Sequence, residues 1–92
     1  MLSKTLEAAI NDQIRDELYS SCFYQAMSAW ASSANLDGAA RWLSMQAQEE
    51  HEHAMKLYEY LLERGGKVVL QAIAQPPSGF SSLLDVFEQV LA

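Results

Sequence analysis

The chain has 92 residues, half of them apolar, and a formal net charge of −6 at pH 7. The apolar content predicts a folded chain and excludes an intrinsically disordered one. Twelve acidic residues against six basic residues argue against the broad positive surface that binds nucleic acid, so we expect no nucleic-acid partner. No stretch approaches the roughly 20 apolar residues of a membrane span, and the N-terminal segment has no apolar signal region. We therefore expect a cytoplasmic protein with no membrane partner.

The length and the single cysteine limit how the fold is stabilised. Cys22 has no partner for a disulfide within the chain, which fits a reducing compartment, and we interpret it as a small buried thiol on a helix. A chain this short buries a small fraction of its surface as a monomer, and it has neither a disulfide framework nor a zinc-type cysteine cluster. We expect something outside the single chain to complete its core.

A long helix is predicted over residues from about 3 to 35. This segment contains no proline or glycine. Apolar or small residues recur in it every three or four positions, at Leu6, Ile10, Ile14, Leu18, Cys22 and Ala29. Ser3 is a suitable N-cap. The helix should end in a tight turn at Asn35 and Gly38, which tolerate left-handed backbone angles, with Asp37 available to cap the next helix.

The rest of the chain predicts a second long helix, a connection and a short third helix. The second helix should run from about 38 to 64 and lie antiparallel to the first, because the turn between them is short. Residues 65–81 contain both prolines and no helical period, which indicates an extended connection. A short helix is expected over about 82–92, with Ser82 as its N-cap and Asp85 at its positive end. The predicted fold class is all-α.

Polar residues interrupt the faces of the two long helices that we expect to point inward. The inward series of the first helix is Leu6, Ile10, Gln13, Glu17, Tyr24, Met27 and Ala31. That of the second helix is Leu43, Gln46, Glu50, His53, Leu57 and Tyr60, with Ala47, Ala54 and Leu61 beside it. Five residues, of which Met27 also belongs to the first series, are interpreted as packing residues: Trp30, Trp42, Met27, Met45 and Met55.

The interruptions should meet across the hairpin. Glu50 and His53 are three residues apart, so both head groups lie on one side of their helix. Glu17 is about as far before the turn as Glu50 is after it, to within about 8 Å at ~1.5 Å per residue. Two carboxylates and an imidazole on facing helices require a cation or a proton, because an unpaired buried carboxylate is costly. Metal binding would satisfy all three.

Other interpretations of these polar residues stay open. A Glu-x-x-His pair alone is more often a solvated pair, or a core histidine bonded to its neighbour, than a metal site. Glu49 is either a surface charge or a secondary contact to a cation, and Tyr24 is either a core residue or a neighbour of a metal-bound carboxylate. His51 and Glu52 should face solvent, because residues two apart on a helix point in different directions. The i, i+4 histidine pair of zinc proteases is absent.

Three groups of residues together resemble the first half of a bacterial non-haem ferritin. They are Glu17 with Tyr24, the segment from Gln46 to Glu50 with His53 to Lys56, and the segment from Glu63 to Lys67. The resemblance covers essentially the whole chain. It implies that residues 1–92 form a single half-ferritin domain and part of a ferritin-like four-helix bundle. It also implies a di-iron ferroxidase centre that oxidises Fe(II) with O₂ or peroxide and passes Fe(III) to storage.

The resemblance assigns roles to individual residues. Glu17, Glu50 and His53 match the ligands of one iron, Glu50 matches the bridging carboxylate, and Tyr24 matches a nearby tyrosine. In the family the other ligands come from the third and fourth helices, and this sequence ends about one helical stretch after the long connection. Half of the family's metal site is therefore not supplied by these residues.

A two-fold homodimer would supply the missing groups. Di-iron carboxylate bundles use a Glu from each of two helices and a Glu-x-x-His from each of the other two. One predicted hairpin supplies one of each, so we expect a symmetric site made by Glu17, Glu50 and His53 of two chains, within a dimer or a larger assembly. Such ligands suit Fe(II), Fe(III) or Mn(II). The alternative function is a non-catalytic, truncated ferritin half that self-assembles through its apolar faces and binds metal weakly or not at all.

Overall fold

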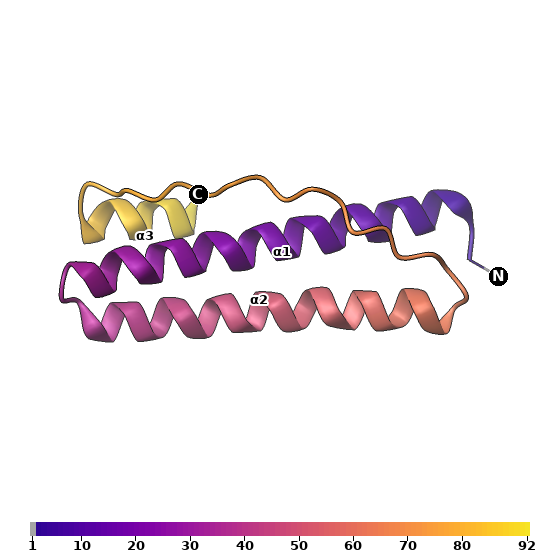
Figure 1. Ribbon diagram of the computed structural model, residues 1–92, viewed down its shortest axis with the longest axis horizontal. Helices are drawn as coiled ribbons and strands as arrows, with labels where there is room; N and C mark the ends of the chain where they lie inside the picture. The colour runs from indigo at the N-terminus through magenta and orange to yellow at the C-terminus, as the bar shows by residue number, and fades with distance from the viewer. Residues whose placement is uncertain (1) are drawn as a thin grey trace.

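The computed structural model describes residues 2–92, and the described residues form three helices and no strand. Helix α1 spans Lys4–Ser33, α2 spans Asp37–Glu63 and α3 spans Leu83–Leu91. The two long helices lie side by side as an antiparallel hairpin, and the short α3 lies against the end of the hairpin where the chain turns (Figure 1). The predicted all-α class is confirmed.

The ends of α1 follow from local side chains. The Leu6 amide donates to Ser3 Oγ at 3.1 Å, which confirms Ser3 as the N-cap. The turn after α1 places Asn35 at φ 61°, in the left-handed region that asparagine tolerates. Such a turn closes the hairpin in three residues, which forces α2 back along α1.

Asp37 does not cap α2 as predicted. The N-cap is Leu36, which makes no side-chain hydrogen bond, and Asp37 is the first residue of the helix. The Leu36 amide donates to the Ala31 carbonyl at 2.8 Å, so the turn closes one residue earlier than expected. The Asp37 carboxylate still lies in the first turn of α2, where a negative charge is favourable.

The buried contact between α1 and α2 is shifted from the predicted inward series. In α2 the fully buried positions are Leu43, Ala47, Ala54 and Leu61, three of which the prediction placed beside the series. His53 and Tyr60 are exposed instead, and so is Leu6 on α1. The small alanines allow the two helices to approach closely. The hairpin contact thus occupies one face of α2, and the Glu50–His53 stripe lies at its margin.

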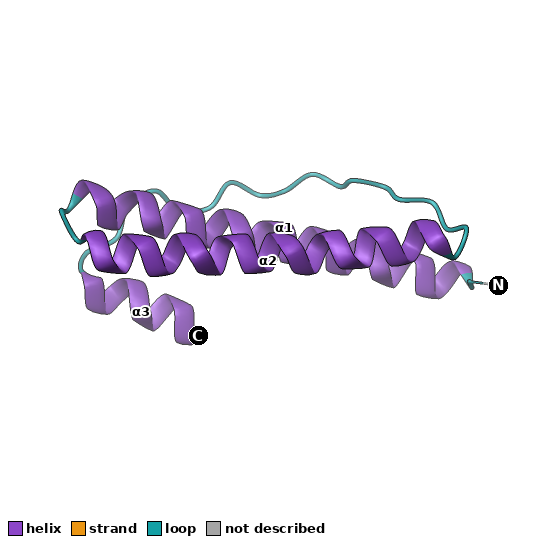
Figure 2. Cartoon of the chain, turned by 90° about the horizontal axis from the view of Figure 1, so that it is seen from below, coloured by secondary structure: helices purple, strands orange, loops and turns teal. Residues whose placement is uncertain are grey.

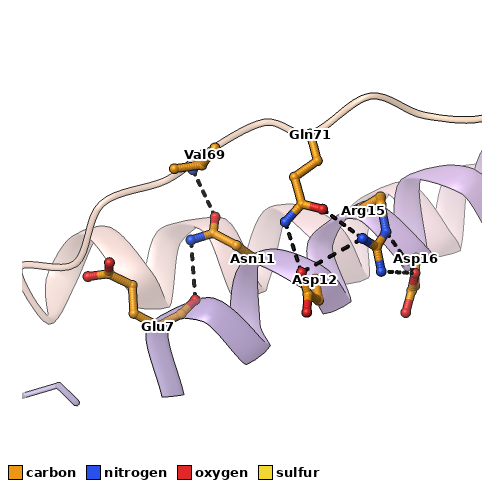
Figure 3. Close-up of polar contacts among 7 residues, drawn as sticks. All are labelled: Glu7, Asn11, Asp12, Arg15, Asp16, Val69 and Gln71. Atoms are coloured by element: carbon orange, nitrogen blue, oxygen red, sulfur yellow. Dashed lines mark hydrogen bonds and ion pairs between the residues drawn. The ribbon is translucent and has the colours of Figure 1, made fainter. Parts of the chain in front are cut away.

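The connection from α2 to α3 is extended and runs along α1 over residues 66–81 (Figures 1 and 2). Its main anchor is the buried Asn11, whose side-chain amide donates to the Lys67 carbonyl at 2.9 Å and accepts from the Val69 amide at 2.8 Å. Farther along, Gln71 bonds to Arg15 at 2.7 Å and to Asp12 at 2.9 Å (Figure 3). These contacts hold an otherwise irregular segment against the hairpin.

Helix α3 packs on its own hairpin, against the turn end of α1 (Figures 1 and 2). Val86 is fully buried in a cluster with Met27, Ala31 and Leu43. The Ser82 hydroxyl caps α3 by accepting from the helix amide three residues on, as predicted. The third helix therefore covers the turn end of the hairpin and leaves the middle of the hairpin open.

Two other expectations about single residues are wrong, because Cys22 and Met45 are exposed. Trp42 is also partly exposed, but its ring packs against Phe87 at 5.8 Å between centroids. These side chains lie outside the buried faces because the short α3 covers less of the hairpin than the other two helices of a complete four-helix bundle would. Among residues 2–92, no helix is both long enough and apolar enough to span a membrane.

Candidate metal centre

Glu17, Glu50 and His53 converge midway along the hairpin. His53 Nδ1 lies 3.8 Å from Glu17 Oε2 and 3.7 Å from Glu50 Oε2. One ligand atom from each of the three side chains lies within 4.8 Å of the others. This group is the single such cluster found in the described part of the chain. The structure therefore brings together the three residues that the spacing argument paired across the hairpin.

Each side chain of the cluster is positioned by its helix. Glu50 and His53 are one turn apart on α2, and Glu17 extends from α1 toward them. The relative register of the helices is supported nearby by Ser21, whose hydroxyl donates to the Ala47 carbonyl at 2.7 Å. Gln13, one turn before Glu17 on α1, donates from Nε2 to Glu17 Oε1 at 2.9 Å.

The electrostatics of the pair follow from the proximity of two carboxyl groups. The hydrogen bond with Glu17 raises the pKa of Glu50 above its ordinary value, and partial burial and the negative charge of Glu17 act in the same direction. The pKa of Glu17 is lowered, chiefly by the hydrogen bond from Glu50, against the opposing effect of burial. Two negative charges this close together are unfavourable. A divalent cation would stabilise both carboxylates.

The donor set fits iron. Two carboxylates and one imidazole are ligands that suit Fe(II), Fe(III) and Mn(II). The side chains of Glu17 and Glu50 are 20% and 23% exposed, whereas that of His53 is 55% exposed. The site is thus partly buried on its hairpin side and open on the other.

Tyr24 lies beside the cluster, two turns after Glu17 on α1. Burial raises the pKa of its hydroxyl, and the negative charges of Glu50 and Glu49 raise it further. The hydroxyl therefore stays protonated and able to donate a hydrogen bond at neutral pH. Tyr24 also lines a cavity of about 230 Å³ between α1 and α3, together with Val90 and Ala92. Helix α3 thus approaches α1 next to Tyr24.

The other acidic and histidine residues of this segment do not join the cluster. Glu49 is exposed, lies outside the group of three, and borders a shallow hollow with Met45 and Glu52. His51 and Glu52 are exposed, as predicted. The sequence argument did not recognise the contact of Gln13 with Glu17, because it assigned Gln13 to the inward series. An amide four residues before a carboxylate on a helix is the signal that indicates such a bond.

With this geometry established, the chain can be compared with known proteins. A family model described as a ferritin-like domain matches residues 7–92. The chain belongs to the ferritin family. Its similarity to solved ferritins is consistent with this membership. An engineered closed form of the Archaeoglobus fulgidus ferritin superposes with a TM-score of 0.95 at 41% identity, covering 98% of this chain and 55% of that chain. The open-pore ferritin from the same archaeon gives the same TM-score and identity, with 98% and 56% coverage.

Curated relatives cover the chain almost completely. The bacterial non-heme ferritin of Campylobacter jejuni is 46% identical over 89 residues, which are 97% of this chain and 53% of the relative. That of Staphylococcus epidermidis is 40% identical over 92 residues, which are 100% of this chain and 55% of the relative. The chain therefore spans about half the length of the curated relatives that it matches, and its fold is that of about half a ferritin chain.

Proposed function

We propose that this ferritin-family chain binds iron through Glu17, Glu50 and His53 and takes part in Fe(II) oxidation and iron storage. The observation that supports the proposal is the convergence of three ligand atoms, from two helices, within 4.8 Å of one another. The names of the relatives, bacterial non-heme ferritins, agree with iron as the substrate.

The proposed roles follow from the position of each side chain. Glu50 lies within 4.8 Å of both Glu17 and His53 through one oxygen and would bridge two irons, while the other two residues would each bind one iron. The iron, as substrate, would lose one electron to O₂ or peroxide. The part of the protein is to hold the substrate with negatively charged oxygens, which stabilise Fe(III) more than Fe(II). Tyr24 would donate a hydrogen bond to a ligand carboxylate.

A di-iron centre needs ligands beyond these three, and a two-fold homodimer remains our prediction for their source. The position of α3 limits how such a dimer can form. Tyr24 and Met27 continue the stripe of Glu17 along α1, and both face α3, Met27 through its contact with Val86. A second hairpin laid over the ligand face would meet α3. The symmetric dimer therefore requires α3 to leave its hairpin or to be exchanged between copies.

The proposal is tested by titrating the 92-residue chain with Fe(II) under anaerobic conditions and then admitting O₂. We expect iron uptake followed by the absorbance of Fe(III), and we expect Glu50→Ala to abolish both, because it removes the carboxylate shared by the site. Glu52→Ala is the matched control, since Glu52 is exposed on the same helix and outside the cluster. If the unaltered chain takes up no iron, or if Glu50→Ala behaves like Glu52→Ala, the proposal fails.

Native mass spectrometry during the same titration tests the homodimer separately. Two irons in a dimer of two chains would agree with the symmetric site. Saturation at one iron per chain without dimer formation would contradict the dimer and leave iron binding by the hairpin intact.

A further inference from the structure

Glu17 has an unusual set of neighbours for a carboxylate at a candidate metal site. Its two oxygens are in different environments. Oε1 accepts a hydrogen bond from Gln13 Nε2 at 2.9 Å, and Oε2 faces His53 Nδ1 at 3.8 Å. Oε2 is therefore the oxygen that faces the cluster with Glu50 and His53. The amide of Gln13 distinguishes the oxygen that faces the metal position from the one that does not.

Arg15, the basic residue closest to Glu17 in the sequence, does not compete for this role. Arg15 is two residues before Glu17, but its guanidinium is bonded to Asp16 at 3.1 and 3.2 Å and to Gln71 at 2.7 Å, on the side of α1 that carries the connection (Figure 3). Gln13 Nε2 is an uncharged donor to Glu17 Oε1, beside the hydrogen bond that Glu17 receives from Glu50. Glu17 is thus oriented by an uncharged donor, which does not repel a cation.

We infer that Gln13 is a positioning residue for the metal site, holding Glu17 so that it binds metal through Oε2 alone. This inference rests on the proposed metal-binding function. A partner that bonds one carboxylate oxygen restricts the rotation of the group and disfavours bidentate binding, in which both oxygens contact the ion. The bond also offsets part of the entropy that a long side chain loses when it binds metal. Its position four residues before Glu17 suits the backward tilt of side chains on a helix.

The test uses Co(II) alone as the probe, because its visible absorption reports the number and geometry of its ligands. Gln13→Leu removes the donor and keeps a side chain of similar size. We expect the affinity of the 92-residue chain for Co(II) to fall about tenfold, the low end of the range for partners of metal ligands, because this bond is exposed. At saturation, the Co(II) absorption bands of the variant should also shift, since Glu17 can then bind through both oxygens.

The control separates positioning from helix stability. Gln25→Leu changes an exposed glutamine on the same helix, two turns beyond Glu17. We expect it to leave the Co(II) affinity and spectrum unchanged, and we expect both variants to keep the melting temperature of the unaltered chain within about two degrees, as is usual for exposed substitutions.

The outcomes distinguish the inference from the function on which it rests. If the unaltered chain binds Co(II) and Gln13→Leu binds equally tightly with the same spectrum, the inference is wrong and metal binding stands. If affinity falls equally in Gln13→Leu and Gln25→Leu, with no change in the saturated spectrum, the effect is general and the inference is again wrong. If the unaltered chain binds no Co(II), the proposed metal-binding function fails, and the inference fails with it.

Discussion

At the scale of single residues, Gly66 shows how the end of the hairpin is closed. It is the third residue after α2, and its amide donates to the Leu61 carbonyl at 2.9 Å. A Cβ atom built on Gly66 would lie 2.5 Å from Leu61 Cδ1 and 2.9 Å from Leu2 Cδ2. Leu61 is fully buried, so moving its side chain disturbs the packing around it. Glycine at 66 is therefore required by close packing rather than by backbone angle.

This packing leads to a prediction about stability. Gly66→Ala should lower the free energy of unfolding by about 1–3 kcal/mol, because the added methyl group forces a buried leucine out of position. Gly38→Ala is the matched control. Nothing lies within 4 Å of its added Cβ, and alanine favours the helix, so stability should rise by up to about 1 kcal/mol. Urea denaturation measures both changes, and equal stability of the two variants would contradict the packing argument.

The residues of the candidate site also show what spacing alone predicts. Glu50 and His53 share one side of α2 because of their i, i+3 spacing, and the equal distances from the turn placed Glu17 opposite them. The bond from Gln13 to Glu17 was not predicted, because Gln13 falls in the periodic series of the first helix and was therefore assigned to its inward face. Its exposure depends on where the neighbouring helix lies, and helix periodicity contains no information on that.

At the scale of elements, α3 is a helix of nine residues that depends on its N-terminal cap. The Asp85 amide donates to Ser82 Oγ at 3.1 Å, and the Asp85 carboxylate accepts from the Ser81 amide at 3.0 Å. This hydrogen bond from Ser81, together with one from Gln89, lowers the pKa of Asp85 below its ordinary value of 3.8. Isolated helices of this length are unstable in water, so the cap and the packing must both contribute.

The lowered pKa of Asp85 predicts how α3 responds to pH. Because the folded state favours the charged carboxylate, the stabilisation by Asp85 is present above its ordinary pKa and is lost as the pH falls through the lowered value. Amide exchange in α3, compared between the unaltered chain and Asp85→Asn, isolates this effect from other acidic groups. We expect the difference in protection to disappear at low pH, and a difference that does not depend on pH would contradict the assignment.

At the scale of the whole molecule, one buried side chain joins α3 to the hairpin. Val86 is fully buried against Met27 and Leu43, whereas Leu84, on the outer face of the same helix, is 69% exposed. The fold thus consists of a long hairpin and a short helix attached at its turn end (Figures 1 and 2). The cluster of Glu17, Glu50 and His53 lies on the part of the hairpin that α3 does not cover.

This arrangement predicts unequal effects of two substitutions in α3. Val86→Ala should destabilise the packing of α3 by about 1–3 kcal/mol, because it removes buried methyl groups and leaves a cavity. Leu84→Ala should change stability by no more than about 0.5 kcal/mol, because its side chain is already in water. Two signals would report the loosening of α3 from the hairpin. They are the ellipticity of the helices and the near-ultraviolet signal of Trp42, which contacts Phe87. Similar effects of the two substitutions would contradict the packing of α3 on its own hairpin.

The amino-acid sequence by itself determined the local features of this protein. Helix periodicity, the caps at Ser3 and Ser82 and the left-handed turn at Asn35 depend on neighbours in the chain, so the three helices and the antiparallel hairpin could be predicted. So could the meeting of Glu17 with Glu50, because it follows from counting residues from the turn. These are short-range consequences of backbone geometry.

Only the tertiary structure decided which side of each helix is covered. Ala47 and Ala54, rather than Gln46 and His53, form the hairpin contact, and Cys22 lies in solvent, although each belongs to an acceptable helical stripe. A stripe on one helix is compatible with several neighbouring faces, and the choice depends on how closely two particular helices approach. The position of α3 against Met27 and Leu43, which leaves the ligand cluster open, is likewise a result of packing between segments far apart in the chain.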